Sequence, residues 1–449
     1  MLLRRHFLFV ASLLASTTAV MADEAAAGFR AQFLAGNLSW DDVLTQARSE
    51  GAVQFFYWGG DDNLNVWMDS VVAPAMAALG VTLVANRITA TKDAVDLVIA
   101  DAAAGRTIGD GSVDAIWLNG ENFYTLKQQD LLFGSFARAL PNAVNFEWEA
   151  ADARSQLNLR DFGTLTDGAE VPWSGEQYVC AANRAQLPVA QTPHTFEDLR
   201  AYLEANPGKF AYIKPPHYLG NTFVQQVLYA FNPDGTGAEP FQQAIADLGA
   251  AELARLVAPG FAYLKQIEPL LLGGPQGAVR YPEDAAAAEG LFRNSEIHIN
   301  CGFGLYAVAT KRANGSYPQT AEEIIFPAGN MIKNKNYLAI PANAPNPAAA
   351  LVLANYMSSV DAQVTKLDLV GYPAGIDPWT LELADAAALA AAAPAHFGVT
   401  QDELDANIAP DTNASLVDVI EATWLEYIER GSRLPLEEIV ANAVAKLAP

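Results

Sequence analysis

The first half of the chain alternates apolar strands with helices, and this alternation constrains the fold more than any other feature. Residues 53–58 (VQFFYW) form a continuous apolar run that predicts a buried strand, and residues 81–85 and 113–118 predict two more. Helices are predicted between them, because apolar side chains recur at helical spacing from Leu64 and Thr91 is a typical N-cap residue. Apolar strands separated by helices indicate a parallel sheet with both faces covered.

A second α/β pattern follows a segment, residues 171–182 (VPWSGEQYVCAA), that carries Pro and Gly and interrupts the alternation. The elements predicted after it are strands at 209–214, 296–300, 324–327 and 337–340, and helices at 221–231, 241–256 and 348–357. The 449 residues exceed what one hydrophobic core usually supports, so we expect two or more lobes.

Residues 1–22 have the properties of a secretory signal peptide. Arg4 and Arg5 give a positive start, residues 7–14 are almost wholly apolar, and cleavage is expected before Asp23. The apolar run is shorter than the roughly 20 residues that span a bilayer. Both general secretion and twin-arginine export remain open. No cysteine lies near the cut, so we expect a protein without a membrane anchor, free in a bacterial periplasm.

Composition excludes some partners. The formal net charge of −24 opposes binding to nucleic acid or to anionic lipid. The histidines show no paired spacing, so neither a metal site nor a cofactor is expected. Cys180 and Cys301 are the only cysteines, and an oxidising compartment permits a disulfide without showing that they meet.

The motifs of common enzymes are missing from the sequence. It contains no G-x-S-x-G, no G-x-G-x-x-G that opens a helix, no phosphate loop and no H-E-x-x-H. His194 and His217 lie in predicted loops without an evident carboxylate partner, and His298 lies in an apolar strand. We therefore expect a protein that is not an enzyme, with a secreted hydrolase as the less favoured alternative.

Polar and aromatic residues gather in three predicted loops. Ligands of open parallel sheets bind at the carboxyl ends of strands, where loops meet helix N-termini. The candidate ligand-binding residues from these loops are Trp58, Gly59, Gly60, Asp61, Trp117, Asn119, Glu121, Tyr218 and Asn221. Each tryptophan could instead be a core residue, and Asp61 and Glu121 could instead serve the start of a helix.

A long stretch resembles a known family. Within residues 323–366, EIIFPAGNMIKNKNYLAIPANAPNPAAALVLANYMSSVDAQ is similar to the strand, turn, strand, loop and helix of periplasmic solute-binding proteins of ABC importers. VDAIWLNGENF and VPWSGEQYVC support the likeness, which covers most of residues 50–380. The group includes receptors for polyamines, thiamine and iron. The resemblance implies a two-lobed α/β fold of type II, each lobe a mixed or parallel sheet flanked by helices.

The resemblance also implies two chain crossings and a cleft between the lobes. The first lobe would hold residues 51–172 and 296–326, and the second residues 173–295 and 327–449. The crossings would lie at 171–180 and 324–329, which places Cys180 and Cys301 near the hinge. Four further candidates follow from this arrangement. Trp173 and Glu176 lie in the first crossing, Phe303 lies in a tight turn, and Tyr372 lies in a segment that touches the ligand in such receptors.

The expected function is capture of a small solute for the membrane permease subunits of an ABC transporter, by a monomer. Trp, Tyr and Glu together suit an organic cation, such as a thiamine-like or polyamine solute, which Trp173 and Glu176 would clasp against Trp117 or Glu121. Sugars and other neutral solutes remain open, since they also stack on aromatic rings. Ferric iron is disfavoured, because no two tyrosines are adjacent.

We predict that the exported protein begins at Asp23, because the short apolar run ends in Val20-Met21-Ala22. N-terminal sequencing of protein from a periplasmic fraction checks this. An intact Met1, or recovery in the inner membrane, would contradict it.

Overall fold

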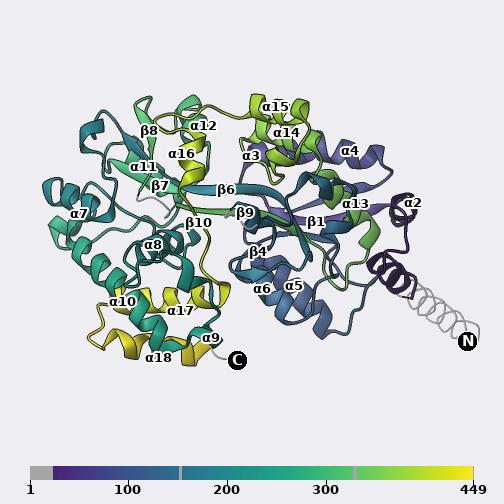
Figure 1. The fold of residues 1–449 in the computed structure, drawn as a ribbon, viewed down its shortest axis with the longest axis horizontal. Coiled ribbons are helices and arrows are strands. Elements are labelled where there is room, and N and C mark those ends of the chain that lie inside the picture. The colour runs from purple at the N-terminus through teal and green to yellow at the C-terminus, as the bar shows by residue number, and fades with distance from the viewer. Residues whose placement is uncertain (1–23, 151–153, 327–330, 448–449) are drawn as a thin grey trace, which may run out of the picture.

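Two α/β lobes lie side by side, joined by two long strands (Figure 1). The structure is a computed structural model and describes residues 24–150, 154–326 and 331–447. The predicted signal peptide lies outside the described residues. Within these ranges every helix is too short or too polar to cross a membrane.

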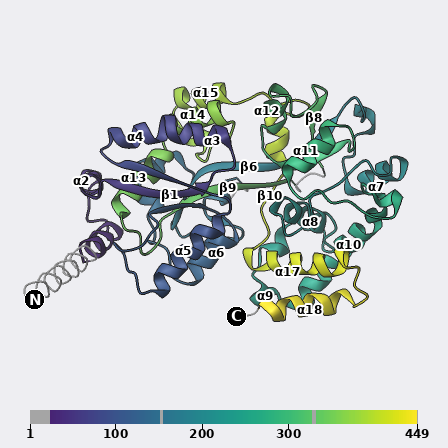
Figure 2. The same ribbon diagram turned by 180° about the vertical axis from the view of Figure 1, so that it is seen from behind.

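The first lobe contains the parallel part of the sheet. In the order β2-β1-β3, β1 (Ala52–Trp58) pairs in parallel with β2 (Thr82–Ile88) and β3 (Ala115–Leu118). Helices cover the sheet as the alternation predicted: α2 (Trp40–Glu50), α3 (Asp62–Trp67), α4 (Ala73–Ala78), α5 (Thr91–Ala103) and α6 (Glu121–Gln128). The carboxyl end of β1 points toward the second lobe (Figures 1 and 2), and β3, which is parallel to β1, ends at the same edge of the sheet.

The two joining strands form one antiparallel ladder. β6 (Glu170–Asn183) pairs with β9 (Met331–Ala339) from Glu170 opposite Ala339 to Gln177 opposite Lys333. At one end β9 also pairs with β3 of the first lobe. At the other end β6 continues into the second lobe. Both strands therefore serve two lobes, and the ladder is the hinge.

The second lobe is built on the far half of β6. Residues 178–183 pair with β7 (Ile299–Phe303) on one side and with β8 (Ala321–Ile324) on the other. Residues of the first half of β9 pair with β10 (Ile408–Ala409). The helices of this lobe are α7 (Phe196–Ala205), α8 (Tyr218–Ala230), α9 (Ile245–Leu248), α10 (Ala250–Ile267), α11 (Ala285–Arg293), α12 (Ala307–Ala313), α16 (Gln401–Ala406), α17 (Ala414–Trp424) and α18 (Leu436–Leu447).

The chain divides between the lobes differently from the prediction. Residues 296–326 were expected in the first lobe, but β7 and β8 pair with the second-lobe half of β6. After β9 the chain returns to the first lobe as α13 (Pro347–Met357), α14 (Val360–Val370) and α15 (Leu383–Ala392), and α13 packs on α2 and β1. Residues 393–400 then cross back, as a third connection. The length of β6 explains the difference, because one strand supplies partners in both lobes.

Several predicted elements also shift. Residues 209–214 form no strand, because Phe210 makes only an isolated bridge to Ile299. The predicted helix at 241–256 is divided at Gly249, whose φ of 77° is incompatible with a continuous helix. The second crossing is β9; of the predicted crossing at 324–329, Ile324 ends β8 and residues 327–329 lie outside the described residues. The sheet is mixed, since the hinge strands are antiparallel.

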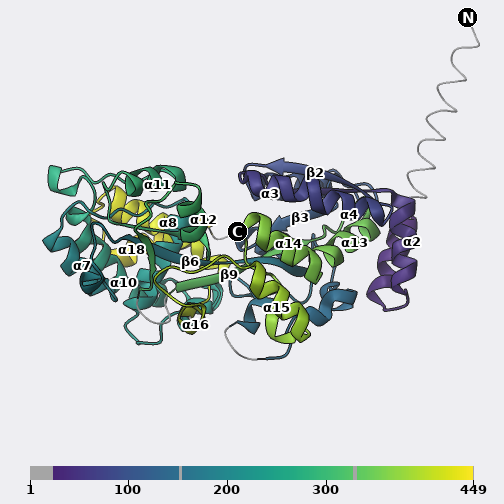
Figure 3. The same ribbon diagram turned by 90° about the horizontal axis from the view of Figure 1, so that it is seen from above.

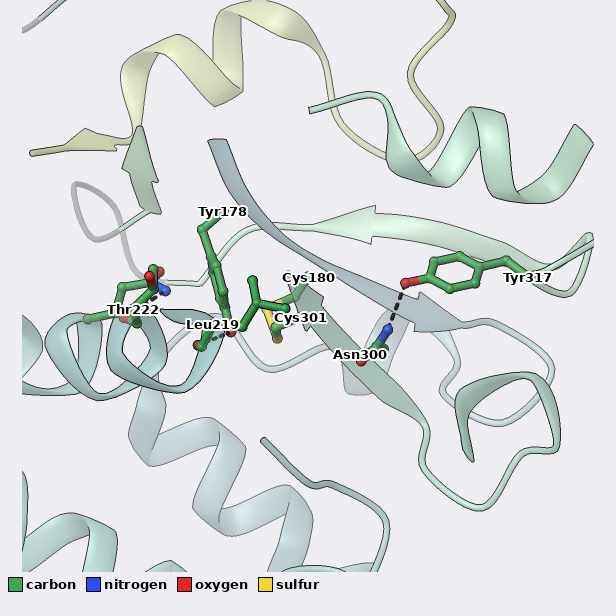
Figure 4. Close-up of a disulfide and its surroundings, with 8 residues drawn as sticks. Tyr178, Cys180, Leu219, Thr222, Asn300, Cys301 and Tyr317 are labelled. Atoms are coloured by element: carbon green, nitrogen blue, oxygen red, sulfur yellow. Dashed lines mark hydrogen bonds between the residues drawn. A yellow bond between two sulfur atoms is a disulfide. The ribbon is translucent and has the colours of Figure 1, made fainter. Parts of the chain in front are cut away.

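Cys180 and Cys301 form a disulfide between β6 and β7 (Figure 4). The two residues lie opposite each other in the strand register, with Cα atoms 4.0 Å apart. Nearby, the Tyr178 hydroxyl donates to the Leu219 carbonyl oxygen, and Asn300 donates to the Tyr317 hydroxyl. The bridge links positions 121 residues apart within the second lobe.

We predict that replacing both cysteines, Cys180→Ser with Cys301→Ser, lowers the free energy of unfolding by about 2–5 kcal/mol, because a long loop in the unfolded chain is no longer closed. Urea unfolding measures the loss. The protein with both cysteines present but the disulfide reduced is the control and should lose a similar amount. A thiol reagent should find no free thiol in the denatured, unreduced protein. Two reactive thiols would contradict the bridge.

Candidate ligand-binding cleft

A cavity of about 170 Å³ lies between the lobes, on one face of the hinge ladder. Its walls come from the loop after β3, the turn between β4 (Arg160–Asp161) and β5 (Thr164–Leu165), both hinge strands, α8 and α17. The lining residues are Asn119, Glu121, Phe162, Glu176, Tyr218, Asn221, Thr222, Gln225, Phe303, Asn334, Asn336 and Val417. Since α6 and α17 also approach each other here, both lobes contribute to one site.

The first-lobe wall depends on Gly120. Its φ of 61° is a conformation that L side chains rarely adopt, and an added Cβ would lie 3.2 Å from the Phe162 ring. The Gly120 amide donates to a carboxylate oxygen of Asp161 at 2.6 Å. This close turn presents Asn119 and Glu121 to the cavity, and Asn119 donates to Asn336 of β9 at 3.3 Å.

Glu176 lies on the floor of the cavity, in the middle of β6. One of its carboxylate oxygens accepts the amide N–H of Leu305 at 3.0 Å. Burial raises the pKa of Glu176 to about 7, with a smaller contribution from the charge of Asp61, whereas the hydrogen bond from Leu305 and the charges of Lys366 and Lys311 oppose the shift. The group can therefore change its charge near neutral pH.

Other acidic groups surround the cavity. Burial raises the pKa of Glu121, and the charge of Asp418 adds to the shift. Burial also raises the pKa of Asp411 to about 8, with a further contribution from Glu121. Among the described residues that line the cavity, none is Lys or Arg. The lining is therefore acidic and suited to a cation, and the charges of Lys311 and Lys366 behind it offset part of the carboxylate charge.

The second-lobe wall is aromatic and polar. The Tyr218 ring stacks on the Phe303 ring at 6.3 Å and on the His217 ring at 4.6 Å. Asn221 is held by a hydrogen bond from its amide nitrogen to Glu421 at 3.2 Å. Aromatic faces beside carboxylates can hold an organic cation through cation–π and ionic contacts together.

The cavity unites part of the predicted set, namely Asn119, Glu121, Glu176, Tyr218, Asn221 and Phe303. The remaining loop residues Trp58, Gly59, Gly60, Asp61, Trp117 and Tyr372 do not line it, and their ligand contacts stay a prediction. One oxygen of Asp61 caps α3 at the Asn63 and Leu64 amides. The other accepts the Tyr372 hydroxyl at 3.1 Å, which joins the first loop to the segment after α14.

Trp173 has a different place from the one predicted. Its side chain is fully buried, stacked on Trp67 at 6.3 Å and met edge-on by Trp117 at 5.0 Å. The ammonium group of Lys366, itself a buried residue, lies 5.2 Å from the centroid of the Trp173 ring. We therefore replace the predicted ligand contact of Trp173 by a packing role beside the hinge.

Sequence reasoning missed several lining residues: Phe162, Thr222, Gln225, Asn334, Asn336 and Val417. A signal for two of them is present in MIKNKNYLA, where Lys and Asn alternate. Alternating residues of a strand face opposite sides, so Asn334 and Asn336 share one face of β9. Phe162 and Val417 carry no such signal, since the turn and the helix reach the cavity only through the tertiary fold.

Comparisons with known proteins agree with this architecture. The sequence profile of the bacterial extracellular solute-binding proteins matches residues 70–397. Protein YnjB of Escherichia coli strain K12 is 34% identical over 389 residues, which are 86% of this chain and 93% of that protein.

Two solved structures share the fold. The cyclic α-maltosyl-1,6-maltose binding protein of Arthrobacter globiformis has a TM-score of 0.61 at 15% identity, over 88% of this chain and 98% of that one. An ABC transporter structure from Clostridium perfringens has a TM-score of 0.56 at 14% identity, over 84% and 99%.

We predict that Trp173→Ala lowers the free energy of unfolding by about 3–5 kcal/mol, because it leaves a cavity in the ring stack. Trp379→Ala is the matched control, since Trp379 is 46% exposed; its loss should cost about 1 kcal/mol or less, the value of its stacking with Arg154. Urea unfolding followed by circular dichroism measures both. Equal losses for the two variants would contradict the packing role.

Proposed function

Because the chain belongs to the family of bacterial extracellular solute-binding proteins, we propose that it captures a small organic cation in the periplasm and delivers it to the permease of an ABC transporter. The resemblance seen in the sequence is thereby confirmed at the level of the family. The observation that carries the choice of ligand is a cavity that contains Glu121 and Glu176, aromatic rings and, among the described lining residues, no basic side chain.

The electrostatics support a cation. Both lining carboxyls have raised pKa values because burial disfavours their charge, so a bound positive group would recover part of that cost. Asp418 adds negative charge behind the walls, whereas Asp411, whose pKa burial raises to about 8, is mostly protonated at neutral pH. The same carboxylates would repel an anionic solute. The rings of Tyr218 and Phe303 supply an apolar face for the carbon skeleton of an organic ion.

A neutral sugar is the second candidate, and one observation favours it. Carboxamides line much of the cavity, from Asn119, Asn221, Gln225, Asn334 and Asn336. Such groups both donate to and accept from hydroxyls, and sugars also stack on aromatic rings. The carboxyls then decide between the candidates, because a neutral ligand would leave their charge uncompensated.

The family is one of receptors and not an enzyme class, and we propose that this chain binds its solute without changing it. We also propose that it closes on its ligand by bending at the hinge. The lining residues come from both lobes, so a ligand that touches both walls favours the closed form. The β6–β9 ladder joins the lobes, and its register shifts between Pro172 and Ser174, an irregularity at which such bending can occur.

The ligand is first identified by mass spectrometry of small molecules released from protein purified without denaturation. We predict a cation, and that Glu176→Gln weakens its binding by about ten- to a hundredfold, the loss of one charged hydrogen bond of roughly 1.5–3 kcal/mol. Calorimetric titration measures this. Glu437→Gln, an exposed glutamate of α18, is the control and should leave the affinity unchanged.

Affinity should also depend on pH with a definite sign. The pKa of Glu176 in the ligand-free protein is about 7, so the carboxylate is charged above that pH and takes up a proton below it. Cation binding should therefore weaken as the pH falls through about 7, and the Gln variant should lack this part of the dependence. A neutral or anionic ligand, or unchanged affinity in Glu176→Gln, would contradict the proposal.

A further inference from the structure

A second and larger cavity, of about 630 Å³, lies on the opposite face of the hinge ladder. Along β9 the side chains of Asn334 and Asn336 face the cleft, whereas Lys333 and Lys335, which alternate with them, line the second cavity. Glu176 and Asn334 border both spaces. We call this second space the rear cavity.

Both lobes supply its walls. On the first-lobe side are Leu367 of α14, the segment from Pro373 to Trp379, and α15. On the second-lobe side are Leu305 and Tyr306 before α12, with His396, Gln401 and Asp405 near α16. Figure 3 shows α15 in the first lobe and α16 in the second, both on the same side of the hinge strands. An occupant of the rear cavity would therefore touch both lobes.

The part of the first-lobe wall that α15 supplies is apolar. Ala386, Leu389, Ala390 and Ala393 line the cavity at helical spacing, so one face of α15 points into it. Leu157 and Ile376 extend this surface. Alanine side chains leave the space open, and a volume of this size is typical of sites for small organic molecules.

The basic side chains around the rear cavity already have partners, and Glu176, which borders it, accepts the amide N–H of Leu305. Lys335 donates to Asp377 at 2.8 Å and also to Asn158 and the Gly375 carbonyl oxygen. Lys333 donates to Asp405 at 2.9 Å, and Arg154 stacks on Trp379. An ionic ligand would have to break these pairs, at the cost of leaving a buried charge unpaired. Charge complementarity therefore favours an uncharged occupant.

We propose that the rear cavity is a second ligand site, which binds an uncharged, largely apolar organic molecule such as an aromatic or alicyclic compound. It is distinct from the cleft because it lies across the ladder from Asn119 and Glu121. Because the walls of the rear cavity belong to both lobes, its affinity for the occupant depends on the angle between the lobes. A bound occupant therefore shifts the equilibrium between the open and closed forms.

The test uses N-phenyl-1-naphthylamine, an uncharged apolar dye whose fluorescence rises in apolar surroundings. We expect saturable binding to the purified mature protein, with one dye bound per chain. Ala390 lines the cavity and is exposed, so Ala390→Phe places a ring in the cavity and should weaken dye binding by about tenfold or more. Ala386→Phe should have the same effect. Ala388→Phe is the matched control, because Ala388 is exposed on the same helix and does not line the cavity.

A cleft variant separates the two sites. Val417→Phe fills part of the ligand-binding cleft from α17 and should leave dye binding unchanged. Melting temperatures and circular dichroism identify any variant that fails to fold, and the two α15 positions provide independent readings. Full dye binding by a folded Ala390→Phe, loss of binding in Val417→Phe, or no saturable binding to the parent protein would each overturn the proposal. A failure of the cation proposal at Glu176 would leave this one standing.

Discussion

The antiparallel pairing of β6 with β9 is the constraint on which the rest of the structure depends. Both strands run through both lobes, so their register, with Glu176 opposite Asn334, fixes where the two walls meet. Alternation of side chains along this ladder then divides the interlobe space into two. Asn336 faces the polar cleft, Lys333 and Lys335 face the rear cavity, and Glu176 and Asn334 border both.

Buried lysines hold the segment after α14 against this ladder. Lys366 donates to the carbonyl oxygens of Trp173 and Pro373, and to Gln363. Lys335 joins Asp377 and the Gly375 carbonyl from the other side. Such groups are costly to bury and are tolerated because each ammonium finds several oxygens. Burial raises the pKa values of the cleft carboxyls, and at Glu176 the charges of Lys366 and Lys311 oppose this shift only in part.

Local patterns were sufficient for the first lobe and insufficient for the hinge. Residues 53–58 and 113–118 are apolar runs between helices, and they became β1 and β3 near the predicted places. The lobe assignment of 296–326 was wrong because strand pairing across such sequence distances carries no local signal. Trp173 illustrates the same limit: an aromatic residue beside a crossing can face the ligand or the core, and only packing against Trp67 and Trp117 decides.

The sequence by itself determined the α/β class, the family, and several cleft residues that follow strands or start helices. These depend on periodicity, composition and loop position, which are local properties. Tertiary structure alone decided the partner of Cys180, the burial of Trp173 and the union of Glu121 with Glu176 across the cleft. The rear cavity also belongs to this second group, since its walls come from segments far apart in the chain that meet only when β6 and β9 pair.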